Sequence, residues 1–198
     1  MRDSEKTKAK IIAAVGKLLG KKGFSKVGIN AIAREAGVDK VLIYRYFGGL
    51  QKLLRSYARG AEFWPSIKEL LGDNVGDMKS PVDFGVALLK GHLRELLKRP
   101  ITQEVMRWEL HERNELTDEL AEFRENQGLE IMKLLPMEEK KVTQKDVAAV
   151  AAIIHAGITY LVLRSKTADV YLGVDLTEDD GWERISQAIE RMLRSYLD

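Results

Sequence analysis

The chain has 198 residues, of which 45% are hydrophobic and 31% are charged, and its formal net charge is only +2. It contains no cysteine, which excludes disulfides, cysteine-ligated zinc and thiol nucleophiles. No apolar run approaches the roughly 20 residues that a membrane-spanning helix needs, and the charged start lacks the apolar core of a signal peptide, so we predict a soluble, cytoplasmic protein.

Charge is distributed unevenly along the chain. Residues 1–60 contain 14 Lys and Arg against 4 Asp and Glu, whereas the remainder contains 18 against 26. Such an asymmetry indicates an N-terminal surface that meets a polyanion. Nucleic acid and an anionic membrane both fit, and a solvated basic face without a partner is the remaining alternative.

Helices are predicted over most of the chain, because no period-2 alternation is sustained over a long run. The first helix follows Thr7 and ends near Gly23, which fits a left-handed C-terminal cap. Gly16 and Gly20 lie inside this helix, where each is unfavourable by about 1 kcal/mol relative to alanine. The apolar stripe of the helix consists of Ile11, Ile12, Val15, Leu18 and Leu19.

Two short helices and a glycine turn follow. The first covers residues 30–36, the turn contains Gly37, and the sequence DKVLIYRYF at residues 39–47 forms the second. Asp39 is a plausible N-cap, since its carboxylate can accept from the first free backbone N–H groups. A short helix, a turn with glycine and another short helix form the helix-turn-helix pattern.

Helical spacing divides the second of these helices into two faces. Ile43 and Phe47 point inward, and Tyr46 lies near the same side. The outward and flanking residues are Lys40, Val41, Leu42, Tyr44 and Arg45.

The outward residues suit contact with DNA. Lys40 lies in the first turn, where helix N–H groups already favour anions. Arg45 can donate paired hydrogen bonds to a phosphate or a guanine edge, and the hydroxyl of Tyr44 can reach a phosphate. Val41 and Leu42 can contact thymine methyl groups in a major groove. The alternative is a surface helix whose apolar residues meet another helix.

Longer helices are predicted in the rest of the chain. One begins at Leu50 and runs toward Leu71, and Pro65 should kink or split it. The others are expected at about 82–98, 101–113, 116–135, 143–164 and 180–197.

Two of these helices have the apolar faces of a dimer interface. The helix at 143–164 has one stripe of Val147, Val150, Ile154, Ile158 and Leu161. Its second stripe is small: Ala148, Ala152, Ala156 and Gly157. The last helix repeats Ile185, Ile189, Met192 and Tyr196. Two such helices from each subunit can form a four-helix interface, and the alternative is that all these residues form the core of a monomer.

Residues 7–57 resemble the N-terminal domain of the TetR family of bacterial transcriptional regulators. The matching features are "II…LL…KKGF" in the first helix, "INAIAREAGV" in the second, "DKVLIYRYF" in the third and "LQKLL" at the start of the fourth. The resemblance implies an all-α homodimeric repressor, with a helix-turn-helix DNA-binding domain at residues 1–49. It further implies a helical effector-binding and dimerisation domain at residues 50–198, which dimerises through the helices near 143–164 and 180–197.

The resemblance also implies the partners and the DNA-facing residues. The partners are double-stranded DNA with a pseudo-palindromic operator and a small-molecule effector. The DNA-facing residues are Gly28, Asn30, Lys40, Val41, Leu42, Tyr44, Arg45 and Lys52.

The sequence departs from the family pattern in three places. Val27 and Gly28 replace the Thr or Ser that commonly caps the second helix. Val41 and Leu42 stand where the family often has Gly and Thr, so the groove-facing surface is unusually apolar. Leu50 replaces the usual lysine at the start of the fourth helix.

Large side chains and a histidine in the later helices form a candidate effector pocket: Phe63, Trp64, His92, Met106, Trp108 and Tyr160. An enzyme or a metal sensor that uses His92, Glu109 and His111 is the alternative function. No H-E-x-x-H or phosphate-binding glycine loop is present, and no histidine has another at i+3 or i+4. We therefore predict no catalysis, no cofactor and no metal, and no contact with a membrane, which would require a basic amphipathic helix.

Overall fold

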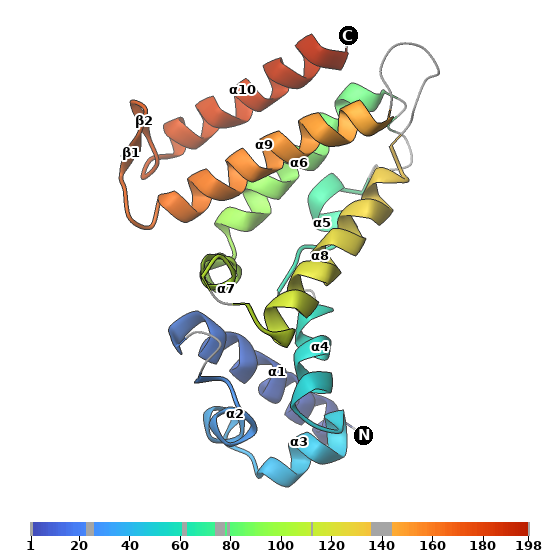
Figure 1. The fold of residues 1–198 in the computed structure, drawn as a ribbon, viewed down its shortest axis with the longest axis vertical. Helices are drawn as coiled ribbons and strands as arrows, with labels where there is room; N and C mark the ends of the chain where they lie inside the picture. The colour runs from blue at the N-terminus through green and yellow to red at the C-terminus, as the bar shows by residue number, and fades with distance from the viewer. Residues whose placement is uncertain are drawn as a thin grey trace. The chain divides into compact units, whose positions relative to one another are not determined.

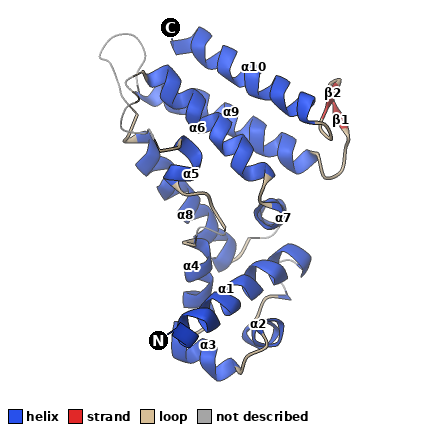
Figure 2. Ribbon diagram, turned by 180° about the vertical axis from the view of Figure 1, so that it is seen from behind, coloured by secondary structure: helices blue, strands red, loops and turns tan. Residues whose placement is uncertain are grey.

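The computed structural model describes residues 2–22, 26–60, 63–73, 78, 80–111, 113–135 and 144–197. Its elements are α1 (Arg2–Lys22), α2 (Ile29–Ala36), α3 (Lys40–Phe47), α4 (Leu50–Ala58), α5 (Ile67–Leu71), α6 (Pro81–Leu97), α7 (Pro100–Glu109), α8 (Glu115–Met132), α9 (Gln144–Arg164), β1 (Val170–Tyr171), β2 (Val174–Asp175) and α10 (Asp179–Leu197) (Figure 1). The prediction of an all-α protein is confirmed: β1 and β2 form only a short antiparallel hairpin (Figure 2).

The first helix is longer than predicted. It begins at Arg2 instead of after Thr7, and Asp3 and Glu5 lie in its first turn. Carboxylates there interact favourably with the partial positive charge of the helix N-terminus, which explains the earlier start. The predicted C-cap Gly23 lies outside the described residues.

The helix predicted from Leu50 to Leu71 is split: α4 already ends at Ala58, α5 begins at Ile67, and Pro65 lies between them. Proline cannot donate a helical hydrogen bond. The next residue, Ser66, then starts α5 with a capping box: its hydroxyl accepts from the Glu69 N–H, and its own N–H donates to Glu69 Oε2 at 2.7 Å. Such reciprocal capping stabilises a new helix start directly after the break.

The chain forms two compact units. The first unit comprises residues 1–64 and 99–127, and the second comprises residues 65–98 and 128–198. The functional boundary expected between residues 49 and 50 stays a prediction, because a compact unit and a functional domain need not coincide.

In the first unit, α1 packs against α2, α4 and α7. The two glycines inside α1 lie where neighbouring helices approach. A Cβ at Gly16 would lie 3.0 Å from the Tyr57 ring of α4, and one at Gly20 would lie 3.6 Å from the Ile101 side chain of α7. A methyl group at position 16 would therefore press against the Tyr57 ring, which would have to shift by a few tenths of an ångström, so the close approach of α1 and α4 favours glycine there. Fully buried residues of the core include Ile11, Val15, Leu19, Ile32, Ile43 and Leu53.

In the second unit, α6 packs against α5, α9 and α10. The three long helices α6, α9 and α10 run alongside one another in both views (Figure 1 and Figure 2). Gly91 of α6 touches the backbone of Leu70 in α5, so this crossing also depends on a missing side chain. The core cluster consists of Leu70, Leu71, Phe84, Ile131, Leu135 and Val147.

Helix α9 has one buried and one exposed apolar side. Ile154 and Ile158 are buried. The exposed side, here called the α9 outer face, consists of Ala148, Ala149, Ala152, Ile153, Ala156, Gly157 and Tyr160. The expectation that no apolar run approaches a membrane span is wrong by length and composition, because the helix at residues 146–164 contains an 18-residue stretch with a mean hydropathy of 1.9, of which only 17% is buried. These properties do not distinguish a membrane span from a face that another protein covers.

Candidate nucleic-acid interface

The turn between α2 and α3 depends on a left-handed glycine. Gly37 has φ 66° and ψ 39°, a conformation that glycine adopts without a steric penalty. Its N–H donates to the carbonyl of Arg34, and the N–H of Val38 donates to the carbonyl of Ala33. These bonds end α2 and direct the chain into α3, as the sequence predicts.

Helix α3 is capped at both ends. Asp39 accepts from the backbone N–H of Val41 at 2.8 Å, which confirms the predicted N-cap. At the other end, Gly48 has φ 76° and donates its N–H to the carbonyl of Tyr44. An eight-residue helix is marginal without such caps, so these bonds and the buried Ile43 hold α3 in place.

The exposed face of α3 carries the expected chemistry. The side chains of Val41 and Tyr44 are 61% and 55% exposed, and Lys40 and Arg45 are also exposed. Leu42 is half-buried and contributes less surface. Among the described residues, no carboxylate pairs with Lys40 or Arg45. Both cations are therefore available to an external anion.

An open groove of about 490 Å³ runs between α2 and α3. Its lining includes Lys26, Asn30, Arg34, Lys40 and Tyr44. Lys26 and Arg34 were not among the predicted DNA-facing residues. Helical spacing could have found Arg34, because it lies four positions after Asn30 on the same face of α2.

The other predicted DNA-facing residues lie at the start of α2 and on α4. Gly28 is the N-cap of α2 and makes no side-chain capping bond, as the missing hydroxyl leads one to expect. Gly28 also lines the groove together with Asn30. Lys52 is exposed on α4, and its side chain lies over Gly48. All eight predicted residues belong to the first unit.

Residues 11–57 match the sequence model of the bacterial regulatory proteins of the tetR family. The matched segment covers most of α1, all of α2 and α3, and α4 up to Tyr57. The N-terminal part of the chain is therefore similar to the DNA-binding domain of the tetR family of bacterial regulators. The predicted resemblance is confirmed.

Solved structures share the fold of nearly the whole chain. FadR, a fatty acid degradation regulator of Bacillus halodurans, is 17% identical, with a TM-score of 0.68 and 94% of each chain covered. NalD of Pseudomonas aeruginosa, the secondary repressor of the MexAB-OprM multidrug efflux pump, is 21% identical, with a TM-score of 0.67 and 96% of each chain covered. FadR of Bacillus subtilis, solved with stearoyl-CoA, is 20% identical, with a TM-score of 0.67 and coverage of 93% of this chain and 96% of that one. No curated protein matches the chain.

The residues predicted for the effector pocket are divided between the two units of the chain. Phe63, Trp64, Met106 and Trp108 lie in the first unit, whereas His92 and Tyr160 lie in the second. Tyr160 is exposed on the α9 outer face. Their joint role stays a prediction.

Phe63 and Trp64 are buried around an arginine. The guanidinium carbon of Arg124 lies 5.8 Å from the Phe63 ring centroid and 5.7 Å from the Trp64 ring centroid. Arg124 also donates two hydrogen bonds to the carboxylate of Glu109. Burial raises the pKa of Glu109, and the bonds and positive charge of Arg124 oppose that rise. Arg124 therefore links both aromatic rings to Glu109.

His92 is buried in the second unit and stacks on His155 of α9, with ring centroids 4.1 Å apart. Its Nε2 lies 3.5 Å from Thr159 Oγ1. Burial, and secondarily the neighbouring His155, holds the pKa of His92 well below its usual value. Glu109 pairs with Arg124, and His111 is exposed in the turn after α7. Among the described residues, no three His, Asp or Glu side chains are grouped for a metal ion.

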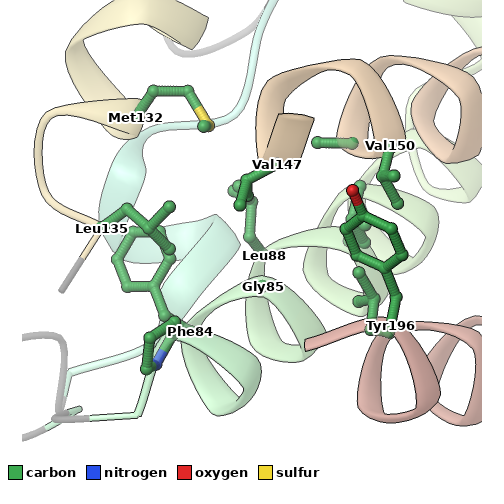
Figure 3. Close-up of a pocket in the computed structure, with 12 residues that line it drawn as sticks. Phe84, Gly85, Leu88, Met132, Leu135, Val147, Val150 and Tyr196 are labelled. Carbon is green, nitrogen blue, oxygen red and sulfur yellow. The ribbon is translucent and has the colours of Figure 1, made fainter. Parts of the chain in front are cut away.

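A separate apolar hollow lies in the second unit (Figure 3). It has a volume of only about 20 Å³ and is walled by α6, the end of α8, α9 and α10. None of the six residues predicted for the effector pocket lines it. The labelled lining residues are Phe84, Gly85, Leu88, Met132, Leu135, Val147, Val150 and Tyr196.

Proposed function

We propose that the chain is a homodimeric, cytoplasmic repressor that binds a pseudo-palindromic operator through α3 and leaves it when a small-molecule effector binds. The observation that carries the proposal is the capped helix α3, which Ile43 anchors in the core. It presents Lys40, Tyr44 and Arg45 to solvent beside a cationic groove. A helix of this kind fits the major groove of double-stranded DNA.

Each exposed residue of this surface has a role that its chemistry allows. Arg45 reads a guanine edge through paired hydrogen bonds, and Val41 contacts a thymine methyl group. Lys40, at the N-terminus of α3, binds a phosphate where the helix N–H groups also attract anions.

Residues around the groove between α2 and α3 supply further backbone contacts. Lys26 and Arg34 flank this groove and add two phosphate contacts. The side chain of Asn30, the backbone at Gly28 and the ammonium group of Lys52 complete the proposed set of contacts.

The α9 outer face supports the homodimer. It places Ile153 and Tyr160 in solvent along a helix that is mostly unburied. The face continues onto the hairpin, because the ring of Tyr160 packs edge-on against Tyr171 at 5.6 Å. Exposed Met192 and Tyr196 of α10 add to the apolar surface. A two-fold dimer through α9 and α10 would present two copies of α3 to successive major grooves, roughly 34–36 Å apart.

The structural relatives support the role of repressor and the response to an effector. NalD is described as a repressor, and the Bacillus subtilis FadR was solved with stearoyl-CoA. In this chain, the effector binds the DNA-free conformation more tightly than the DNA-bound conformation. The free energy of operator binding becomes less favourable by the difference between these two effector-binding free energies.

The first test is a binding titration against salt with the DNA just upstream of the chain's own coding region. An unrelated fragment of the same length serves as the control. Tight selective binding with two protein chains per site is the expected result. Equally weak binding to both fragments that vanishes as salt rises would leave only a basic surface, and it would contradict operator recognition at this site.

A further inference from the structure

We infer that the apolar hollow of the second unit binds the aliphatic part of the effector. This inference deepens the proposed function, on which the word effector rests. The hollow lies between Phe84 and Leu135 on one side and Val150 and Tyr196 on the other, with Leu88 and Val147 between them (Figure 3).

The lining selects hydrocarbon. No charged side chain is among the described lining residues, and the walls are aliphatic except for the rings of Phe84 and Tyr196. Apart from the hydroxyl of Tyr196, the side chains of the lining offer no hydrogen-bonding group, so a polar group that entered elsewhere would lose its water without compensation. An alkyl chain loses nothing by leaving water and gains contact with the walls.

Gly85 lines the hollow, although no close contact with a neighbouring helix requires a glycine at this position. A Cβ at Gly85 would meet only Leu193 Cδ1 at 3.8 Å, an ordinary contact. By contrast, Gly91 on the same helix touches the backbone of Leu70 and cannot be replaced without movement. Glycine in a helix is unfavourable by about 1 kcal/mol relative to alanine. At position 85 the packing does not require glycine, and the missing side chain leaves the wall of the hollow recessed there.

The hollow must widen when a ligand enters. Its volume is about 20 Å³, room for little more than one water molecule, so the side chains of the wall have to move before an alkyl chain fits. Phe84 and Leu135 belong to the core cluster, whereas Leu88 and Met132 are only half-buried and Tyr196 is 42% exposed. The second group can shift, and methionine adapts easily to new shapes.

Widening provides a route from the ligand to the DNA. The walls include α9 and α10, the same helices that carry the proposed dimer surface. An alkyl chain that binds between α6, α9 and α10 changes how α9 and α10 pack against α6. A change in the dimer follows and alters the spacing of the two copies of α3.

The test uses the full chain and the straight-chain alcohols hexanol, octanol and decanol, with binding measured by titration calorimetry. Affinity should rise roughly fourfold with each added methylene until the hollow is full. The variant Gly85→Leu fills the hollow and should weaken octanol binding at least about tenfold. The matched control is Gly128→Leu, because a side chain at Gly128 meets nothing within 4 Å. Circular dichroism checks the fold, and Ala151→Leu replaces Gly85→Leu if that variant does not fold.

Affinity that does not depend on chain length would overturn the inference, and so would equal octanol binding by Gly85→Leu and Gly128→Leu. Operator binding is measured on the same samples. Operator binding without any alcohol binding overturns the inference and leaves the repressor proposal standing. The original chain could also bind alcohols but no operator, while Gly85→Leu binds neither. That result would support the hollow as an aliphatic site and contradict the proposed function.

Discussion

Gly91 of α6 packs directly against the backbone of Leu70 in α5, so that any side chain at position 91 would collide with the Leu70 carbonyl. A backbone obstacle cannot rotate away as the end of a side chain can. We therefore expect Gly91→Ala to lower the free energy of unfolding by about 3 kcal/mol, the upper end of the usual range for overpacking. Gly128→Ala on α8 is the control and should raise it by up to about 1 kcal/mol, because it has space and alanine favours helix. Urea unfolding measures both, and equal stability of the two variants would disprove the close crossing.

The buried His92 should make stability fall in mild acid. An unfolded histidine takes up a proton near pH 6.5, whereas the folded state resists protonation because the pKa of His92 is lowered. Below about pH 6.5 the unfolded state binds more protons, so the free energy of unfolding decreases as pH falls. Above that pH both states are neutral at this residue and it adds no pH dependence.

Comparison of urea unfolding at about pH 8 and about pH 5.5 measures this effect. His92→Gln should lose less stability between the two pH values than the original chain. His111→Gln removes an exposed histidine and should behave like the original chain. If both variants lose as much stability as the original, the burial of His92 is not the cause.

The helix-turn-helix could be predicted because its signals are local. Asp39 precedes the helix that it caps, Gly37 and Gly48 lie where left-handed residues are needed, and Ile43 marks the buried side. The start of α5 was also present in the sequence, as the capping-box spacing of Ser66 and Glu69.

The hollow could not be predicted, because no local pattern contains it. Its walls come from four helices, and residues as distant as Phe84 and Tyr196 face the same space. Large aromatic residues suggested a pocket by size alone. In the structure, Arg124 lies over the rings of Phe63 and Trp64, an arrangement that depends on the packing of α7 and α8, and the role of these aromatic residues in an effector pocket stays a prediction.

Arg45→Ala tests whether α3 reads bases. If Arg45 binds a guanine edge, the variant should bind the operator more weakly by about 1–3 kcal/mol and unrelated DNA almost unchanged. Arg59→Ala removes another exposed arginine, at the end of α4, and serves as the control for charge. Fluorescence anisotropy with both DNA fragments measures the effect. An equal loss on both fragments would assign Arg45 to a phosphate instead.

Lys40→Ala should act on every DNA sequence alike. A lysine at the N-terminus of α3 that binds a phosphate releases about one counterion, so its loss should flatten the slope of log K against log salt by about one unit. The ratio of operator to unrelated affinity should stay the same. A titration over several salt concentrations measures both quantities. A changed ratio with an unchanged slope would indicate that Lys40 contacts a base.

Ala152→Arg tests the α9 outer face as the dimer interface. Ala152 is exposed in the single chain, so an arginine there should leave the fold of the protomer intact. In a dimer that buries this face, the charge would lose its water without a partner, which costs on the order of several kcal/mol per ion. Sedimentation velocity should therefore show monomers, and operator affinity should fall because the two copies of α3 no longer bind as one unit.

The matched control for this change is Ala121→Arg, which adds the same charge at an exposed position of α8. It should remain dimeric and bind the operator as the original chain does. A dimeric Ala152→Arg protein would show that some other surface joins the subunits. The original chain could instead be monomeric and sediment with lipid vesicles, while the Ala152→Arg variant does not. In that case the apolar face of α9 contacts a membrane, and the proposed two-fold arrangement of α3 on DNA is wrong.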